Sequence, residues 1–334
     1  MSPASSAVVV RLAKTDYLRS DMAQAPPTRI DLKDLQGSPK RIRRERAFRA
    51  LFFGAAFLSI VISAAIVGSL FGEALTFLRN VDLSALIDLD GGWFPRRGRF
   101  DVITIVMGTL VVSLIAMVVA TPLGLGAALY LSEYANPRVR RALKPILEVL
   151  ASIPSVVLGY FALAWISPNV LQALCSQPTS FNLGAAGIAV GILITPLVAS
   201  VAEDSFRSVP MALREASYGM GARQRTTVTN IVFPAAVSGV VASLILGFSR
   251  AIGETMVVAI AAGATGGSLF TLNACGPGQT MTAAMTSLAI GSDQVRGSEG
   301  TFESLFFVGL VLFFMTLVLN LLSERFVRRV RQRY

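Results

Sequence analysis

Six long apolar runs divide this 334-residue chain. A helix needs about 20 consecutive apolar residues to cross the hydrocarbon core of a bilayer, and in lipid every backbone polar group must find its partner within a helix or a closed barrel. The runs therefore predict an all-α integral membrane protein with six transmembrane helices. We expect these helices near residues 47–72, 102–131, 145–167, 184–202, 231–263 and 302–322.

The composition favours a membrane protein that performs no covalent chemistry. Hydrophobic residues make up 53% of the chain and charged residues 15%, whereas soluble domains carry about 25% charged residues. None of the lysines ends the G-x4-G-K-[ST] sequence of a phosphate-binding loop. The lack of histidine disfavours a zinc site or a Cys/His nucleophile. We expect no catalytic residue, no metal site and no cofactor bound by this chain.

Lysine and arginine are distributed unevenly between the polar segments. If the N-terminus is inside, 24 of them fall in the inner segments and five in the outer segments. Cytoplasmic loops carry such an excess, so both termini and the segment 203–230 are predicted to be cytoplasmic. The net charge of +10 then faces the lipid of the cytoplasmic leaflet, and nucleic acid is not needed to explain it.

Residues 1–46 are polar and precede the first apolar run. They contain Pro26-Pro27 and end in the basic run 40–46, as in disordered segments and juxtamembrane lipid anchors. The first apolar run begins too far along the chain for a secretory signal. We expect a flexible basic cytoplasmic tail, followed by a six-helix membrane domain over 47–330.

Prolines and aromatic residues add detail to the arrangement of the spans. Pro122, Pro154 and Pro196 interrupt three of the runs, which indicates either packing kinks or the lining of a cavity. Trp93-Phe94 stands shortly before the second span, where an aromatic anchor at the membrane interface is expected. The acidic segment before it is read as a solvated linker, or else as a contact for an external protein.

The polar segment between the fourth and fifth runs carries the most specific pattern. Residues 214–234 read REASYGMGARQRTTVTNIVFP. This spacing resembles the EAA loop of ABC importer permeases, EAA-x3-G-x9-I-x-LP, with Ser217 and Phe233 as departures. The resemblance implies a type I ABC importer permease, whose coupling loop over 207–230 docks on a separate ATPase.

Local propensity predicts a helix–turn–helix within this loop. Pro210 precedes several strong helix formers, and Gly219 and Gly221 supply a turn. The alternative is an ordinary polar turn between two spans. The residues that we expect to contact the ATPase are Arg214, Glu215, Ala216, Met220, Gly221 and Arg225.

Arg250 and Glu254 lie four residues apart in the fifth run, and a continuous helix would place them on one face. A charged residue at the centre of a membrane helix costs about 2.5–3.5 kcal/mol on insertion scales, so it normally faces a cavity or a partner. Arginine offers a planar fork of donors that suits phosphate oxygens. The pair therefore predicts a substrate pathway or, alternatively, a self-neutralising structural pair. Thr255 and Ser155 would add hydroxyl donors, or else bond the backbone.

The sequence around this pair is similar to that of phosphate-specific ABC permeases, whose pattern is R-A-x-G-E-T. Residues 254–256, 108–110 and 151–155 are similar to the PstC-type subunit, and the likeness extends over roughly 90–330. The resemblance implies inorganic phosphate as substrate, with Arg250 and Glu254 as transport residues. It also implies a PstA-type permease partner, two copies of an ATPase that holds ATP and Mg, an external phosphate-binding protein and a bacterial inner membrane.

The two cysteines, Cys175 and Cys275, fall in segments predicted to be external. Disulfides persist in oxidising compartments, so a bridge between these two loops is favoured, and free or buried cysteines are the alternative.

Three other functions fit parts of the pattern. A permease for sulfate or molybdate fits the coupling loop but fits residues 250–255 less well. A secondary transporter or channel fits an intramembrane ion pair but leaves the EAA spacing unexplained. A membrane scaffold or signalling component fits the spans alone.

Overall fold

The computed structural model describes residues 39–88, 90–176, 178–263, 266–290 and 300–330. The chain divides into two units, Met1–Ala65 and Ile66–Tyr334, and each is described by itself. Of the tail predicted over 1–46, residues 1–38 lie outside the described residues. For residues 39–46 the structure differs from the prediction, because they begin the helix α3 (Pro39–Asn80). Proline suits the first turn of a helix, and arginine is a strong helix former.

Among the described residues, six helical segments are long and apolar enough to cross a membrane. Three of them are interrupted by π-helical turns, in which the backbone bonding shifts by one residue. The segments are α3; α4 (Val102–Leu129), continued by π-helical Tyr130–Tyr134; α6 (Ser155–Phe161), continued by π-helical Ala162–Leu171 and α7 (Gln172–Leu174); α8 (Leu183–Arg207); α10 (Gln224–Thr227), continued by π-helical Val228–Val232 and α11 (Phe233–Ile252); and α14 (Thr301–Val330).

The third span begins later than predicted. Residues 145–151 belong to a separate helix, α5 (Pro137–Ala151), which has no buried residue. The chain then breaks before Pro154, and α6 starts at Ser155. Proline lacks the amide donor that a continuous helix needs and disfavours helical geometry in the residue before it. The prediction of one helix over 145–167 is therefore wrong at its start.

The fifth span is shorter than the predicted run over 231–263. It ends at Ile252, and a second helix, α12 (Met256–Ala261), follows a break at residues 253–255. In this break the Glu254 carboxylate accepts the amide of Val257 at 3.5 Å, as an N-terminal cap of α12 would. Hydropathy alone predicts one continuous helix over 231–263, because residues 253–255 contain no proline that would indicate a break.

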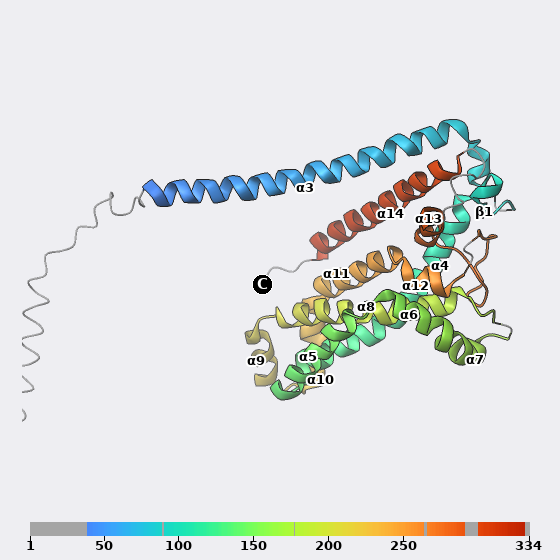
Figure 1. Cartoon of the computed structure of the whole chain (residues 1–334). Coiled ribbons are helices and arrows are strands. Elements are labelled where there is room, and N and C mark those ends of the chain that lie inside the picture. The colour runs from blue at the N-terminus through green and yellow to red at the C-terminus, as the bar shows by residue number, and fades with distance from the viewer. Residues whose placement is uncertain (1–38, 89, 177, 264–265, 291–299, 331–334) are drawn as a thin grey trace, which may run out of the picture. The chain divides into compact units, whose positions relative to one another are not determined.

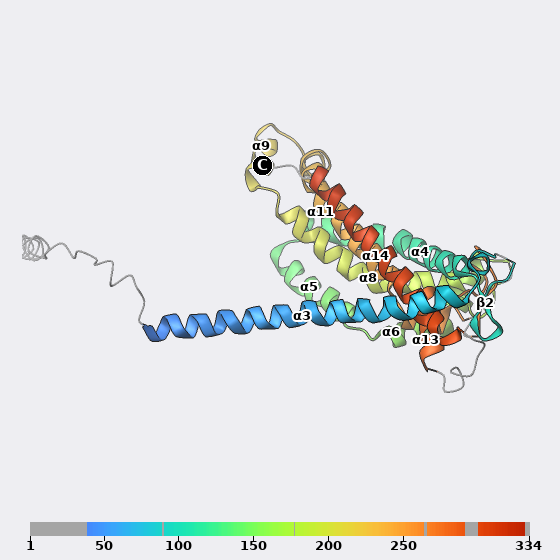
Figure 2. The same ribbon diagram turned by 90° about the horizontal axis from the view of Figure 1, so that it is seen from above.

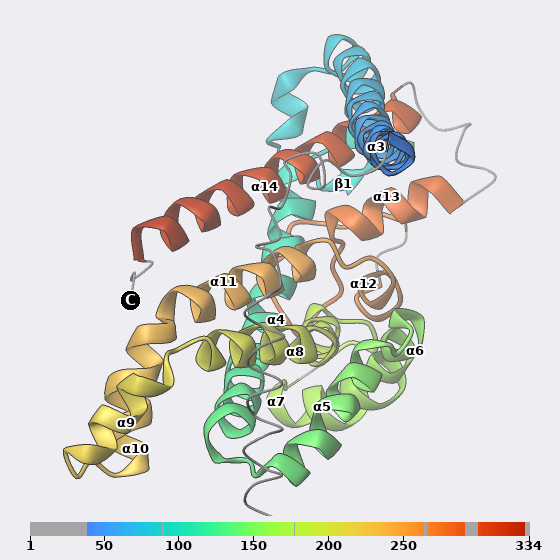
Figure 3. The ribbon, with the colours of Figure 1, turned by 90° about the vertical axis from the view of Figure 1, so that its left-hand side faces the viewer.

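Small residues bring α4 and α8 together at the centre of the second unit, where α8 also contacts α11 (Figure 3). A Cβ atom added at Gly187 would lie 2.7 Å from Ile115, and one added at Gly191 would lie 2.7 Å from Val119. Helices in membranes use glycine and alanine for such close approach. The largest apolar cluster forms around this contact.

A short hairpin closes one end of the second unit. Its strands, β1 (Trp93–Phe94) and β2 (Arg99–Phe100), pair antiparallel, and Trp93 also bridges to Ser268. Trp93 is buried against Phe100 and Phe94 is partly buried, and their place at the membrane interface stays a prediction. The apolar cluster there includes residues of α13 (Met281–Ile290), a helix that the sequence reasoning placed in a loop.

Two ends of this unit matter for the sites below. The hairpin and α7 lie at one end, whereas α9 (Met211–Gly219) lies at the opposite end (Figures 1 and 2). We call these the hairpin end and the α9 end.

Candidate translocation and coupling sites

The segment with the EAA-like spacing forms a helix–turn–helix of α9 and α10. Gly221 makes the turn with a φ of +81°, a conformation that costs other residues energy. The turn is tied at its base, because the Ser217 and Thr227 hydroxyls lie 2.8 Å apart. The element is therefore a structured protrusion at the α9 end, as the local propensities predict.

Arg214 stands on α9 but points inward. It is only 8% exposed, and its Nη2 lies 2.8 Å from both the Glu133 carboxylate and the carbonyl of Phe206. Its Nη1 donates to the carbonyl of Val209. Arg214 thus joins α9 to the ends of α4 and α8, and its burial removes it from the predicted ATPase-contact surface.

The other five predicted contact residues remain on the surface. Met220 is 89% exposed at the tip of the turn. Glu215, Ala216, Gly221 and Arg225 are also exposed. Together they present a small apolar and charged surface that a partner protein can reach, with Arg214 as the buried support beneath it.

A second charged cluster at the α9 end was not predicted from the sequence. Glu203 of α8 is buried, and three cations surround it. Arg140 donates from Nε at 2.8 Å, Lys144 lies at 3.5 Å, and Arg207 at 4.0 Å. The three cations border a cavity of about 720 Å³ that Arg214 also lines. The adjacent carboxylates Glu203 and Asp204, directly after the fourth run, were the available signal.

Arg250 and Glu254 form an ion pair, but not on one continuous helix. Arg250 lies in the last turn of α11, and Glu254 follows the end of that helix. The Arg250 Nη2 and Glu254 Oε2 atoms are 3.7 Å apart, with side-chain exposures of 56% and 4%. Among the described residues no other carboxylate pairs with Arg250. Most of its five N–H donors therefore stay free for an oxyanion.

The break that carries Glu254 is fixed from the neighbouring helices. Thr282 of α13 donates its hydroxyl to the Glu254 carbonyl at 2.6 Å. Beside Arg250, Ser249 donates to Asn320 of α14 at 3.1 Å. Asn320 is the only amide in its apolar run, a signal that the sequence reasoning did not use. Thr282 gave no such signal, because its helix was not predicted.

The two predicted hydroxyl donors, Thr255 and Ser155, are less directly placed at the ion pair than Thr282 and Ser249. Thr255 donates to the Gly253 carbonyl at 3.3 Å, a local backbone bond. Ser155 begins α6 and is partly buried. Its helix packs on α12, but no hydrogen bond joins Ser155 to Arg250 or Glu254 among the described residues.

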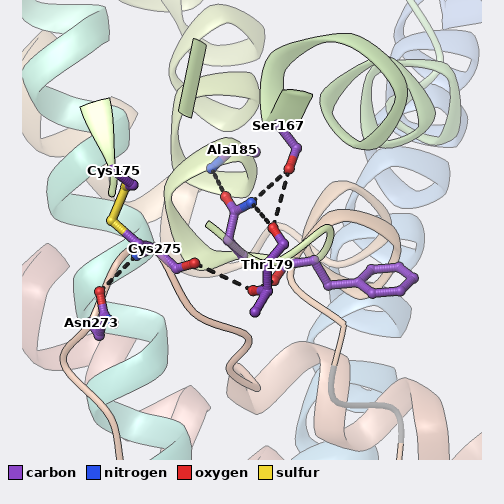
Figure 4. Close-up of a disulfide and its surroundings, with 8 residues drawn as sticks. Ser167, Cys175, Thr179, Ala185, Asn273 and Cys275 are labelled. Carbon is purple, nitrogen blue, oxygen red and sulfur yellow. Dashed lines mark hydrogen bonds between the residues drawn. A yellow bond between two sulfur atoms is a disulfide. The ribbon is translucent and has the colours of Figure 1, made fainter. Parts of the chain in front are cut away.

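Cys175 and Cys275 are joined by a disulfide at the hairpin end, with their Cα atoms 6.1 Å apart (Figure 4). This agrees with the bridge that the sequence favours. Beside the bridge, the Thr179 amide donates to the Cys275 carbonyl at 3.1 Å. The Asn182 side chain contacts Ser167 and caps α8. The bridge therefore holds together the two segments that flank α8 and α12.

The family model described as "Binding-protein-dependent transport system inner membrane component" matches residues 120–334. A "Phosphate transport system permease protein PstC" of Pasteurella multocida (strain Pm70) is 29% identical, over 84% of this chain and 90% of its own length. "PstC 1" of Mycobacterium tuberculosis (strain ATCC 25618 / H37Rv) is 31% identical, over 72% of this chain and 76% of its own length.

Solved structures with a similar fold are transmembrane parts of ABC transporters. One belongs to a bacterial transporter involved in the import of the acidic polysaccharide alginate, with a TM-score of 0.61 at 15% identity, over 88% of this chain and 99% of that chain. Another is the inward-facing MetNI methionine transporter, with a TM-score of 0.53 at 20% identity, over 69% of this chain and 96% of that chain. At these identities the likeness concerns the fold alone.

Proposed function

Because the chain belongs to the family of binding-protein-dependent transport system inner membrane components, and within it to the PstC-type permeases, we propose that it imports inorganic phosphate as the transmembrane subunit of an ATP-driven importer. The observation that carries the substrate assignment is the half-exposed guanidinium of Arg250, fixed beside Glu254 at a helix break. A guanidinium with free donors is suited to phosphate oxygens. The printed names of the relatives supply phosphate as the candidate anion.

Transport proceeds by alternating access. A separate ATPase, which holds ATP and Mg, closes on ATP and moves the α9–α10 turn through its exposed residues. Because Arg214 joins α9 to Glu133 and to the end of α8, this motion reaches the two helices packed at the centre of the unit. Opening of the pathway then brings phosphate past Arg250.

The Glu254 carboxylate keeps the cation in place between transport events. When phosphate arrives, its oxygens replace the 3.7 Å contact with better-aligned charge-assisted bonds. When it leaves, Arg250 returns to Glu254. The weak contact is useful here, since a strong pair would compete with the substrate. Thr255 and Ser155 border the same route as secondary donors.

The assembly contains partners that the family implies. These are a PstA-type permease, two copies of the ATPase and an external phosphate-binding protein. Both termini and the α9 end face the cytoplasm of a bacterial inner membrane, as the 24 inner and five outer lysines and arginines favour. This subunit itself binds no cofactor and contains no catalytic residue.

Uptake of radiolabelled phosphate at low concentration tests this proposal. Cells that lack the chain receive the wild type, Arg250→Gln, or Arg328→Gln as a matched control. Arg328 also pairs with a glutamate four residues away, but on the exposed end of α14. We expect the wild type and Arg328→Gln to restore uptake, and Arg250→Gln to be made but inactive. Full uptake by Arg250→Gln would contradict the assigned role of this residue.

Three further outcomes distinguish the alternative functions. Sulfate or molybdate that displaces labelled phosphate at equal concentration would indicate a different oxyanion importer. Uptake that continues when the ATPase is inactivated would indicate a secondary transporter or a channel. Normal uptake in cells without the chain would leave a scaffold or signalling role.

A further inference from the structure

Helix α5, which precedes the third span, is amphipathic and has no buried residue. Three of its apolar side chains, Ile146, Val149 and Leu150, are 53%, 64% and 41% exposed. They fall on one side of the helix, because residues three and four apart share a face. Three of the four cations of α5 fall on the opposite side, at 3.6 residues per turn. A basic helix with an exposed apolar side is typical of helices that lie at a membrane surface.

The basic side of α5 borders the cavity of about 720 Å³ at the α9 end. Five cations line this cavity: Arg140, Arg141, Lys144, Arg207 and Arg214. Two of them are neutralised by close partners. Arg214 is paired with Glu133 at 2.8 Å, and Arg140 donates to Glu203 at 2.8 Å. The other three cations therefore decide which ligand fits.

These three cations keep donors that a ligand can use. Lys144 and Arg207 approach Glu203 only to 3.5 and 4.0 Å, which is longer than a good hydrogen bond. Their side chains are 34% and 47% exposed, so a ligand in the cavity can reach them. Lys144 also lies 3.8 Å from Asp204, whose side chain is 69% exposed. Among the described residues, no carboxylate pairs with Arg141.

The charges that remain favour an anion with a single negative charge. Two carboxylates offset the three cations, namely Glu148 in the lining and Asp204 beside Lys144. One positive charge is left in excess. A phosphodiester carries one negative charge and matches this excess, whereas a free phosphate group carries more than one near neutral pH. A zwitterionic headgroup brings a cation of its own and does not match.

The cavity is also larger than a phosphate ion needs. Its volume is typical of sites for drug-sized molecules, and Leu131 and Met211 supply apolar walls. Pro145 lines it too, and Val149, one helical turn further, begins the exposed apolar side of α5. A phosphate group held by the cations thus has an apolar surface beside it, as the glycerol and acyl chains of a lipid require.

We propose that this cavity binds the phosphate group of an anionic phospholipid of the cytoplasmic leaflet, with Arg141, Lys144 and Arg207 as its ligands. Basic pockets between helices on the cytoplasmic side of membrane proteins suit such headgroups. Met211 of α9 lines the same cavity, so the bound lipid connects α5 and α8 with the base of the coupling element. The site rests on the proposed function only through the cytoplasmic placement of the α9 end.

Labelling of an introduced cysteine tests this site. The only two cysteines of the chain are joined in the disulfide. Ala135 lines the cavity and is partly exposed, so Ala135→Cys places one thiol there. The intact importer is reconstituted in nanodiscs of phosphatidylcholine with increasing phosphatidylglycerol. It is treated with N-ethylmaleimide, which is uncharged and is not itself attracted to the lipid, and labelling of this subunit is followed by mass spectrometry.

We expect phosphatidylglycerol to slow the labelling of Ala135→Cys. Arg207→Gln raises the half-protecting fraction of phosphatidylglycerol about fivefold, the factor that corresponds to about 1 kcal/mol for one basic residue at an anionic lipid surface. Arg325→Gln is the matched control, since Arg325 is an exposed arginine of α14 that does not line the cavity. It leaves the half-protecting fraction unchanged.

The outcomes distinguish this site from the proposed function. Labelling that ignores phosphatidylglycerol, or protection that Arg207→Gln and Arg325→Gln weaken equally, overturns the lipid site. Protection by inorganic phosphate in nanodiscs of phosphatidylcholine alone assigns the cavity to the free ion and overturns the lipid as its source. Labelling requires no transport. Protection that depends on Arg207 in a chain that imports no phosphate would therefore overturn the proposed function and leave the lipid site in place.

Discussion

Two arginine–glutamate pairs in the second unit differ in burial and in the number of bonds that the arginine makes. Arg214 and Glu133 are both buried, 81 residues apart in sequence, and the arginine makes further bonds to two carbonyls. Arg250 and Glu254 are neighbours in sequence, joined by one contact of 3.7 Å, and the arginine is half exposed. A saturated, buried cation stabilises the fold, whereas an exposed cation with free donors can bind an anion. The first pair therefore positions the coupling element, and the second is placed to meet substrate.

The largest expected effect comes from Arg214→Ala. Removing one partner of a buried pair leaves an uncompensated charge and costs about 3–5 kcal/mol. We expect the unfolding midpoint of the purified importer in mild detergent, followed by circular dichroism, to fall accordingly. Arg223→Ala, an exposed change in the same turn, serves as the control and is expected to leave the midpoint nearly unchanged. Equal midpoints for Arg214→Ala and Arg223→Ala would contradict the stabilising role assigned to the buried Arg214–Glu133 pair.

Arg214→Lys is expected to have a smaller effect of the same kind. Lysine keeps the charge but cannot reproduce the planar fork that reaches Glu133 and the two carbonyls. The loss of hydrogen bonds to a charged group corresponds to about 1.5–3 kcal/mol. The same unfolding measurement checks it, with Arg250→Lys as the comparison. A larger loss of stability at position 250 than at 214 would reverse the assignment of roles.

Gly221→Ala tests the rigidity of the turn above Arg214. A Cβ atom has open space there, but the φ of +81° is unfavourable for alanine, by about 1–2 kcal/mol. Gly219 also has open space and is helical, so Gly219→Ala is expected to be neutral or stabilising by about 0.5–1 kcal/mol. Retention of the ATPase on the immobilised permease gives the functional readout. Identical behaviour of the two alanine variants would argue against a fixed turn.

Arg250→Gln is expected to have the smallest effect on stability. Arg250 is half exposed and makes one contact of 3.7 Å, so the pair is close to a surface ion pair, which contributes about 1 kcal/mol or less. Glu254 is buried but keeps the amide of Val257 as a partner, so the unfolding midpoint should remain close to that of the wild type. A fall in the unfolding midpoint as large as that of Arg214→Ala would instead indicate that the Arg250–Glu254 pair stabilises the fold.

The sequence predicts which segments span the membrane better than it predicts where the helices break. Apolar run length located all six spanning segments, because the bilayer sets a minimum length. The helical form of α9 followed from local propensity. The break at residues 253–255 contains no proline, and Gly253, which ends α11, was its only local signal. Thr282, which bonds the Glu254 carbonyl, belongs to another helix. The same holds for the buried state of Arg214, since Glu133 is distant in the sequence.

Reconstituted importer in proteoliposomes gives the most direct test of the difference between Arg214 and Arg250. Phosphate uptake is measured for Arg250→Gln and Arg214→Lys at a temperature where both are folded, and is expressed per assembled importer. We expect Arg250→Gln, although folded, to import no phosphate, and Arg214→Lys to import phosphate at a reduced rate, because it weakens the link from α9 to the ends of α4 and α8. Wild-type uptake by Arg250→Gln would contradict the claim that this exposed arginine meets the substrate.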